Sequence, residues 1–148
     1  MNDRTLIIIK PDGLQRRLAG EIISRFERKG LKIAAMKFLQ ITPELAQKHY
    51  AVHTGKDFFD RIVKYLSAGP TIIMVLEGPK VIEMSRKMMG ATFGYNAEPG
   101  TIRGDFGTSQ TFNLIHGSDS KESAEYEIGL YFKPEEILDY QMPDQNWV

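Results

Sequence analysis

The sequence contains no cysteine among its 148 residues. Disulfide bonds, thiolate metal sites and cysteine nucleophiles are therefore excluded. An excess of charge of one sign is also missing, because 19 Lys and Arg residues balance 19 Asp and Glu residues. Balanced charge argues against a protein dedicated to nucleic acid or to a membrane surface, but it leaves room for a local basic pocket that binds a small anion. We expect no nucleic-acid partner.

Long hydrophobic runs are absent as well. The apolar run at residues 6–9 is shorter than the core of a signal peptide, and the run at residues 72–76 is far too short to span a membrane. We therefore expect a cytoplasmic protein with no membrane partner. A length of 148 residues with 42% hydrophobic content is typical of one domain, so we expect residues 1–148 to form a single domain with its own core.

Two common nucleotide-binding motifs are missing. The segment HTGKD at residues 53–57 contains a Gly-Lys pair, but a P-loop needs glycine five positions earlier and Ser or Thr after the lysine. Those positions hold Tyr50 and Asp57. The glycine-rich fingerprint of dinucleotide-binding folds does not occur either, so any nucleotide site in this chain must be of another kind.

Two further motifs carry weak signals. His49 and His53 have zinc-ligand spacing, but Tyr50 replaces the catalytic glutamate of the zinc-protease motif and no third ligand is evident, so a solvated helix face is the favoured interpretation. The triplet RGD at residues 103–105 suggests adhesion, to which we give little weight in a cysteine-free chain. Arg103 in a glycine-flanked loop is a better candidate for an anion contact, and an ordinary surface arginine is the alternative.

Hydrophobic periodicity and turn signals predict alternating strands and helices. We expect strands at residues 5–9, 32–41, 71–76 and 111–115, and helices at residues 20–29, 43–50, 56–66, 79–89 and 120–131, with a short last helix from Pro134. Residues 10–13 are expected to form a turn, and residues 91–110 a long loop. This order predicts an α+β fold of the ferredoxin-like split β-α-β type, a sandwich with an antiparallel sheet and added helices.

The first strand is apolar at consecutive positions, which predicts that both faces of the sheet are covered. Helices of the same chain could cover both faces. Alternatively, a second subunit could cover one of them, and the pattern favours neither arrangement.

The octapeptide NLIHGSDS at residues 113–120 places His116 at the end of a predicted strand. Gly117 removes side-chain bulk beside the imidazole. The three residues at positions 118–120 are all of N-cap type, and Asp119 with Glu122 has capping-box spacing, so a helix should begin nearby. Helix N-termini attract phosphate, and a neutral imidazole is a competent nucleophile near pH 7. A phosphate-accepting histidine and a structural histidine at a strand end are both compatible with these residues.

The octapeptide resembles the signature around the phosphorylated histidine of the nucleoside diphosphate kinase family. Further matching blocks follow the family's order and spacing: TLIIIKPDG (5–13), RFERKG (25–30), HY (49–50), FF (58–59), PGTIRGDF (99–106) and FKPEE (132–136). The resemblance extends over nearly the whole chain and implies the same ferredoxin-like fold. It also implies an enzyme that transfers the γ-phosphate of a nucleoside triphosphate, typically ATP, to a nucleoside diphosphate by a ping-pong mechanism.

The resemblance implies a role for each matching residue. His116 would be the nucleophile that becomes phosphohistidine. Lys10, Arg86 and Arg103 would contact the phosphates. The lysine ammonium is a compact point charge, and each arginine guanidinium is a planar group with several hydrogen-bond donors. Residues expected to contact other parts of the nucleotide are Thr92 as a hydroxyl donor to the phosphates, Asn113 at the sugar, and Phe58 stacked on the base.

Three more residues would support the histidine. Tyr50 would line the site near His116 and Lys10, Glu127 would hold the other imidazole nitrogen, and Ser118 would belong to the same network. Mg²⁺ is expected to enter with the nucleotide, with no metal site made by the protein alone. Taken singly, Phe58 would more often be a core residue, Glu127 a solvated helix residue and Lys10 the end of a strand.

Two positions depart from the family pattern. Phe93 and Gly94 stand where the family commonly has Asn-Pro, in a loop used for subunit contacts, and Phe112 stands where it commonly has Arg. The resemblance implies a homo-oligomer. The long C-terminal segment favours a hexamer, and a tetramer is possible.

Three other functions are compatible with parts of the sequence. A non-enzymatic relative would have lost the histidine or the phosphate-binding cations, all of which are present. A phosphocarrier that receives phosphate from another protein would lack a nucleotide pocket, in conflict with Phe58, Thr92 and Asn113. A zinc-dependent hydrolase would have to use His49 and His53.

Overall fold

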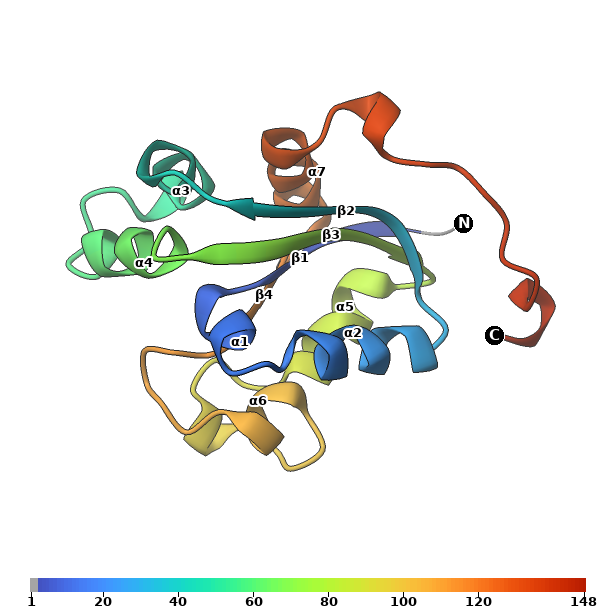
Figure 1. Ribbon diagram of the computed structural model, residues 1–148, viewed down its shortest axis with the longest axis horizontal. Coiled ribbons are helices and arrows are strands. Elements are labelled where there is room, and N and C mark those ends of the chain that lie inside the picture. Colours follow the sequence, from blue (N-terminus) through green and yellow to red (C-terminus); the bar gives the residue numbers. More distant parts are fainter. Residues whose placement is uncertain (1–2) are drawn as a thin grey trace.

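The computed structural model describes residues 3–148, which form a four-stranded sheet with helices on both faces (Figure 1). The strands are β1 (Asp3–Ile9), β2 (Lys32–Gln40), β3 (Pro70–Gly78) and β4 (Ile115–Gly117). They are arranged in the order β2-β3-β1-β4, and every neighbouring pair is antiparallel. This arrangement confirms the predicted α+β ferredoxin-like fold.

In the described part of the chain, seven α-helices surround the sheet. They are α1 (Pro11–Gln15), α2 (Ala19–Arg28), α3 (Pro43–His49), α4 (Phe59–Leu66), α5 (Val81–Met89), α6 (Ile102–Phe106) and α7 (Lys121–Tyr131). Short 3₁₀ turns lie at Ala51–His53, Gly94–Asn96, Pro134–Glu136 and Gln145–Trp147. Within residues 3–148, no helix combines the length and the apolar character that crossing a membrane requires.

Strand β1 supplies the core of both faces. Leu6 and Ile8 pack into one cluster with residues of α3, α4 and α7, whereas Ile7 and Ile9 pack into a second cluster with residues of α2, α5 and α6. All four side chains are fully buried. Figure 1 shows α7 above the sheet and α2 and α5 below it. Helices of the same chain therefore cover both faces, which is one of the two arrangements expected from the sequence.

The predicted helices are confirmed near their expected bounds, and the predicted start signals explain two of them. The Thr42 hydroxyl accepts a hydrogen bond from the Leu45 amide, and Pro43 is the first residue of α3. At α7 the capping residue is Ser120, whose hydroxyl accepts from the Ser123 amide. Ser120 is one of the three N-cap candidates in the octapeptide, and the predicted capping box of Asp119 with Glu122 begins one residue too early.

Three predicted segments differ from the structure. Residues 10–13 do not form a simple turn, because Pro11 starts helix α1 there. The predicted loop at residues 91–110 contains α6, which begins where the Thr101 hydroxyl accepts from the Gly104 amide. The last strand begins at Ile115 rather than at residue 111, since Leu114 has a left-handed φ of 71° that interrupts an extended backbone.

His116 consequently lies in the middle of β4, directly opposite Ile8 of β1. Successive strand residues point to opposite faces, so Gly117 points away from the imidazole. A Cβ atom on Gly117 would lie 2.6 Å from the Met89 sulfur, which belongs to the cluster beneath the sheet. Gly117 thus allows α5 to pack closely against β4, and the expectation that it makes room beside the imidazole is wrong.

The irregular segment before β4 is held by two residues from other elements. The Tyr65 hydroxyl donates to Asp12 Oδ1 and accepts hydrogen bonds from the amides of Asn113 (3.2 Å) and Leu114 (3.3 Å). Asp12 Oδ2 also accepts from the Leu114 amide at 3.1 Å. A left-handed non-glycine residue persists only when its surroundings fix it, and here the fixing groups come from α1 and α4.

We predict that Tyr65→Phe lowers the free energy of unfolding by about 1–3 kcal/mol, because it leaves the Asn113 amide and the Asp12 carboxylate short of a buried partner. Urea unfolding measures this change. Tyr126→Phe is the control, since its hydroxyl donates to the Lys48 carbonyl at an exposed position and its loss should cost less than about 0.5 kcal/mol. Equal losses in the two variants would contradict the proposed role of Tyr65.

Candidate active site

A cavity of about 450 Å³ lies where β1, β4 and the segment before β4 meet α3, α4 and α7. Of the ten residues singled out from the sequence, nine line it: Lys10, Tyr50, Phe58, Arg86, Thr92, Arg103, Asn113, His116 and Glu127. The tenth, Ser118, is fully buried next to Glu127. The fold therefore brings together residues that span more than a hundred positions of the sequence.

His116 is held by a carboxylate from α7. Its Nε2 atom lies 2.7 Å from Glu127 Oε1, and the Ser118 hydroxyl donates to the same oxygen at 2.8 Å. A carboxylate only accepts hydrogen bonds, so Nε2 carries the proton and the lone pair of the neutral imidazole is on Nδ1. Nδ1 is therefore the nitrogen that is available as a nucleophile.

The surroundings of His116 keep its imidazole neutral. Burial is the main cause, followed by the positive charges of Lys10, Arg103 and Arg86, and together they hold the pKa of His116 well below 6.5. Burial also raises the pKa of Glu127 above its usual value. Near neutral pH the ring thus keeps the lone pair that a nucleophile needs.

Arg103 projects inward from α6 and has only 6% of its surface exposed. Its guanidinium donates to three backbone carbonyls, those of Asn113 (3.1 Å), Gly90 (3.0 Å) and Ile115 (2.6 Å). The alternative of an ordinary surface arginine is therefore wrong. With Arg103 buried, the RGD triplet is also not presented as an exposed adhesion motif.

The two other cations are held in a similar way. Arg86 donates to the Gly117 carbonyl at 3.0 Å, and Lys10 donates to the side-chain oxygen of Asn113 at 2.8 Å. Over residues 3–148, none of the ion pairs includes Lys10, Arg86 or Arg103. Because their close partners are uncharged, their positive charge is not neutralised within the site, and the cavity is suited to an anion with several negative oxygens.

Lys10 shows the electrostatic cost of this arrangement. Burial, with the nearby positive charge of Arg103, lowers the pKa of Lys10 from 10.5 to about 7. Arg103 has a pKa lowered to about 10 by burial and by Arg86, so it stays charged at neutral pH. An anion in the cavity would stabilise the charged form of Lys10.

The remaining expected contact residues lie around the cavity. Phe58 immediately precedes α4 and meets the His53 ring edge-on at 5.2 Å, so it is not a core residue. Thr92 is exposed, and its backbone carbonyl accepts from the Asn113 amide group at 3.2 Å. Tyr50 packs edge-on against His49 at 4.7 Å. The structure thus places these residues in one cavity, while their roles toward a nucleotide stay predictions.

His49 was missed by sequence reasoning. Only 5% of it is exposed, so the interpretation as a solvated helix face is wrong. Its ring packs edge-on against His116 at 4.5 Å, and its Nδ1 atom lies 3.0 Å from the Tyr131 hydroxyl. Helical spacing offered a signal, since His49 is three positions after the buried Ala46 and therefore faces the same side of α3.

A metal-ligand grouping also involves His49. Over residues 3–148, one group of three potential ligands lies close together, with atoms of His49, His116 and Glu127 within 4.8 Å of one another. His53 is not part of it, so the His49–His53 zinc arrangement gains no support. The hydrogen bond between His116 and Glu127 and the nearby Lys10, Arg86 and Arg103 make this an unfavourable place for a dication.

The two departures from the family pattern have local consequences. Phe93 stacks on Tyr95 with ring centroids 5.8 Å apart, and both rings are exposed. Gly94 is buried where a Cβ atom would lie 2.2 Å from the Gly107 carbonyl oxygen, so only glycine fits there. Phe112 is also exposed and meets the Tyr65 ring edge-on at 5.2 Å.

Comparison with known proteins agrees with the resemblance noted in the sequence. The family model described as "Nucleoside diphosphate kinase" matches residues 3–137. A nucleoside diphosphate kinase from Pyrococcus furiosus is 57% identical over 141 residues, covering 93% of this chain and 88% of the relative. One from Thermus thermophilus is 56% identical over 136 residues, covering 92% and 99%, respectively.

Two solved structures are also similar over nearly the full chain. A halophilic nucleoside diphosphate kinase from Halobacterium salinarum in complex with CDP has a TM-score of 0.96 at 45% identity, covering 99% of this chain and 98% of the other. A transition-state mimic of the enzyme from Borrelia burgdorferi, with bound vanadate and ADP, has a TM-score of 0.91 at 40% identity, covering 97% and 94%.

The electrostatics of the cavity predict how His116 titrates. We expect its imidazole to stay neutral at about pH 6, and Lys10→Met to raise its pKa, because removing a nearby positive charge favours the imidazolium. Nitrogen-15 NMR of the imidazoles reports both quantities. Lys56→Met is the matched control. Lys56 lies 3.1 Å from His53 and lowers the pKa of that histidine, so its removal should raise the pKa of His53 and leave that of His116 unchanged. An unchanged His116 titration in Lys10→Met would contradict this account.

Proposed function

The chain belongs to the nucleoside diphosphate kinase family, and from this premise we propose which of its residues carry out the reaction. The protein is an enzyme that transfers phosphate between nucleotides. We assign the phosphate carrier to His116. The observation that supports this most strongly is the free Nδ1 lone pair of a neutral imidazole beside cations that have no acidic partner within hydrogen-bonding distance.

The first half-reaction begins when the Nδ1 lone pair attacks the γ-phosphorus of ATP. The new N–P bond forms as the bond to the β–γ bridging oxygen breaks, and ADP leaves with that electron pair. The Nε2 proton stays on the ring, where the Glu127 carboxylate at 2.7 Å stabilises the positive charge that the phosphorylated imidazole gains. A nucleoside diphosphate then enters and takes the phosphate by the reverse sequence, which gives ping-pong kinetics.

Catalysis of such a transfer depends mainly on positioning and on stabilising negative charge at the transferred group. Lys10, Arg86 and Arg103 would supply that charge from fixed positions around His116. The carbonyls and the amide that hold these cations also limit the movement needed when the transition state forms.

The remaining cavity residues would bind the rest of the nucleotide. Phe58 would stack on the base, which tolerates every base because each has a π-face. Asn113 would contact the sugar, Thr92 the phosphates, and Tyr50 would line the cavity beside His116. We propose that Mg²⁺ is bound by phosphate oxygens and water, where it neutralises charge. Glu127 is already bonded to His116 and Ser118, so it is a poor candidate for a metal ligand.

We further propose a cytoplasmic homo-oligomer, with a hexamer favoured over a tetramer and without a nucleic-acid partner. Exposed apolar side chains support association, among them Phe38 and Met36 on β2 and the stacked Phe93 and Tyr95. Strand β2 lies at an edge of the sheet. The C-terminal segment covers part of this edge, where the Leu138 amide donates to the Ala34 carbonyl, and Met36 and Phe38 are exposed farther along the strand. The lack of cysteine is compatible with a reducing compartment, and the zero net charge with the absence of nucleic acid.

Labelling with γ-³²P-ATP tests the phosphate carrier. We expect acid-labile, base-stable label on the wild-type protein and no label on His116→Ala. His53→Ala is the control and should be labelled as the wild type is. Adding unlabelled nucleoside diphosphate should release the label as triphosphate. Label that survives in His116→Ala, or that nucleoside diphosphate does not remove, contradicts the assignment. Labelling only by a phosphorylated protein, and not by ATP, would favour a phosphocarrier instead.

Proton uptake tests the role of Lys10. At about pH 8.5, a Lys10 with a pKa of about 7 is mostly neutral, and nucleotide phosphates should raise its pKa and make it bind a proton. Titration calorimetry with MgADP in two buffers of different ionisation enthalpy should therefore show uptake of about 1 proton. Lys10→Met should abolish the uptake. If the wild type gives the same heat in both buffers, Lys10 does not face the phosphates in the way proposed.

A further inference from the structure

Arg103 depends on helix α6, which is only five residues long. Helices of this length are unstable in isolation, because the cost of starting a helix exceeds the gain from so few hydrogen bonds. The position of α6, and with it the direction of Arg103, must therefore be set by contacts with other elements. Those contacts include the buried side chain of Ile102 in the core and the hydrogen bonds of Arg103 itself. Arginine side chains from the N-terminal part of the chain add further contacts.

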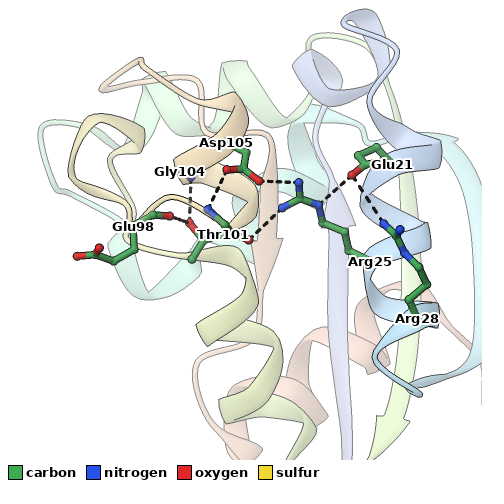
Figure 2. Close-up of polar contacts among 8 residues, drawn as sticks. Glu21, Arg25, Arg28, Glu98, Thr101, Gly104 and Asp105 are labelled. Carbon is green, nitrogen blue, oxygen red and sulfur yellow. Dashed lines mark hydrogen bonds and ion pairs between the residues drawn. The ribbon is translucent and has the colours of Figure 1, made fainter.

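Arg25 of α2 makes the most extensive of these contacts (Figure 2). Its guanidinium donates to Asp105 Oδ2 at 2.6 Å and to the Gly100 carbonyl at 3.2 Å, and it lies 4.9 Å from the centre of the Phe106 ring. A single side chain thus contacts the residue before the cap of α6 and both residues at its C-terminal end.

The two partners of Arg25 are also bonded to each other. Asp105 Oδ1 accepts from the Gly100 amide at 2.8 Å, which closes a ring of three hydrogen bonds with Arg25. Glu21 accepts from Arg25 Nε at 3.1 Å and so orients the guanidinium from within α2. Charge-assisted bonds in such a planar arrangement fix geometry as well as add energy.

The start of α6 adds a steric requirement. The Thr101 hydroxyl donates to the Glu98 carbonyl at 2.6 Å and accepts from the Gly104 amide at 3.0 Å (Figure 2). A Cβ atom on Gly104 would lie 1.9 Å from the same Glu98 oxygen. The RGD triplet therefore has three separate tasks: Arg103 points into the cavity, Gly104 allows close packing, and Asp105 points outward to α2.

Arg28 provides a natural contrast on the same helix. Its closest ionic contact is with Glu21 at 3.9 Å, and 69% of its side chain is exposed, compared with 19% for Arg25. In Figure 2 the dashed line from Arg28 leads to Glu21 within α2. Arg28 therefore has the same chemistry as Arg25 without its connection to the cavity.

We propose that Arg25, acting through Asp105 and the Gly100 carbonyl, is a positioning residue that holds α6 so that Arg103 is directed at the transferred phosphate. The inference rests on the role proposed above for Arg103. A small displacement of a catalytic group can lower a reaction rate strongly, so a distant contact that fixes α6 affects chemistry. Arg16 also donates to the Phe106 carbonyl at 2.7 Å, so losing Arg25 should weaken the position of α6 without abolishing it.

The test compares Arg25→Ala with Arg28→Ala. We expect Arg25→Ala to raise the KM for nucleoside diphosphate and to lower kcat/KM about tenfold, and Arg28→Ala to change neither by more than about twofold. The amount of phosphohistidine formed per chain from labelled ATP should stay the same in both variants, while its rate of formation falls in Arg25→Ala. A general loss of folded protein would instead lower that amount and leave KM unchanged.

Two milder variants cover the case in which Arg25→Ala does not fold. Asp105→Asn keeps the shape of the side chain and removes its charge, and Arg25→Lys keeps the charge and removes the planar fork. Both variants should raise the KM for nucleoside diphosphate, but by less than Arg25→Ala does. Because they interrupt one contact, the double variant Arg25→Lys/Asp105→Asn should lose less than the product of the two single effects.

Arg103→Gln separates this inference from the proposed function. A strong loss of kcat/KM in Arg103→Gln together with normal kinetics in the Arg25 and Asp105 variants overturns the inference alone. Normal kinetics in Arg103→Gln overturns the role of Arg103, and the inference with it. Equal effects of Arg25→Ala and Arg28→Ala would show that general charge on α2, and not the position of α6, is responsible.

Discussion

The repulsion among Lys10, Arg86 and Arg103 is the constraint on which the rest of the site depends. Cations brought together in a partly buried cavity would normally be paired with carboxylates, which would use up their charge. Here the close partners are backbone carbonyls and one amide side chain, which orient the cations without neutralising them. Burial is the main cause of the lowered pKa values of Lys10 and His116, and the neighbouring positive charges lower them further. A polyphosphate ligand would relieve the repulsion among the three cations. The arrangement therefore lowers the stability of the free protein and strengthens the binding of the ligand.

Much of the fold could be predicted because its signals are local. Strand β1 and helices α2 to α5 follow from apolar periodicity, from Thr42 and Pro43 at a helix start, and from Gly90 at a helix end. The segment before β4 could not be predicted in this way. Its composition resembles a strand, yet Tyr65 and Asp12, which are distant in sequence, hold Leu114 in a left-handed conformation. Likewise, α6 is too short for its periodicity to be visible, and its stability comes from tertiary contacts.

The candidate site also has a part that the sequence predicts and a part that only the structure shows. The resemblance alone identifies the members of the site as a set, since Phe58, Glu127 and Lys10 are each common residue types in ordinary positions when taken singly. What the structure adds is how they are connected: which imidazole nitrogen is free, which groups hold each cation, and the buried ring of His49 beside His116. None of these depends on residue type alone. Each is set by the register of β4 against β1 and by the placement of α3 and α7, which only the folded chain determines.

The hydrogen bonds of Arg103 to the carbonyls of Gly90, Asn113 and Ile115 have a consequence for sequence drift. Every amino acid brings the same carbonyl, so no substitution at those three positions can delete an acceptor, and only a change in the path of the backbone can. An arginine anchored to side chains would be lost whenever one partner mutated. Anchored to the main chain, Arg103 does not depend on which side chains its partners carry, and its direction is inherited with the path of the backbone.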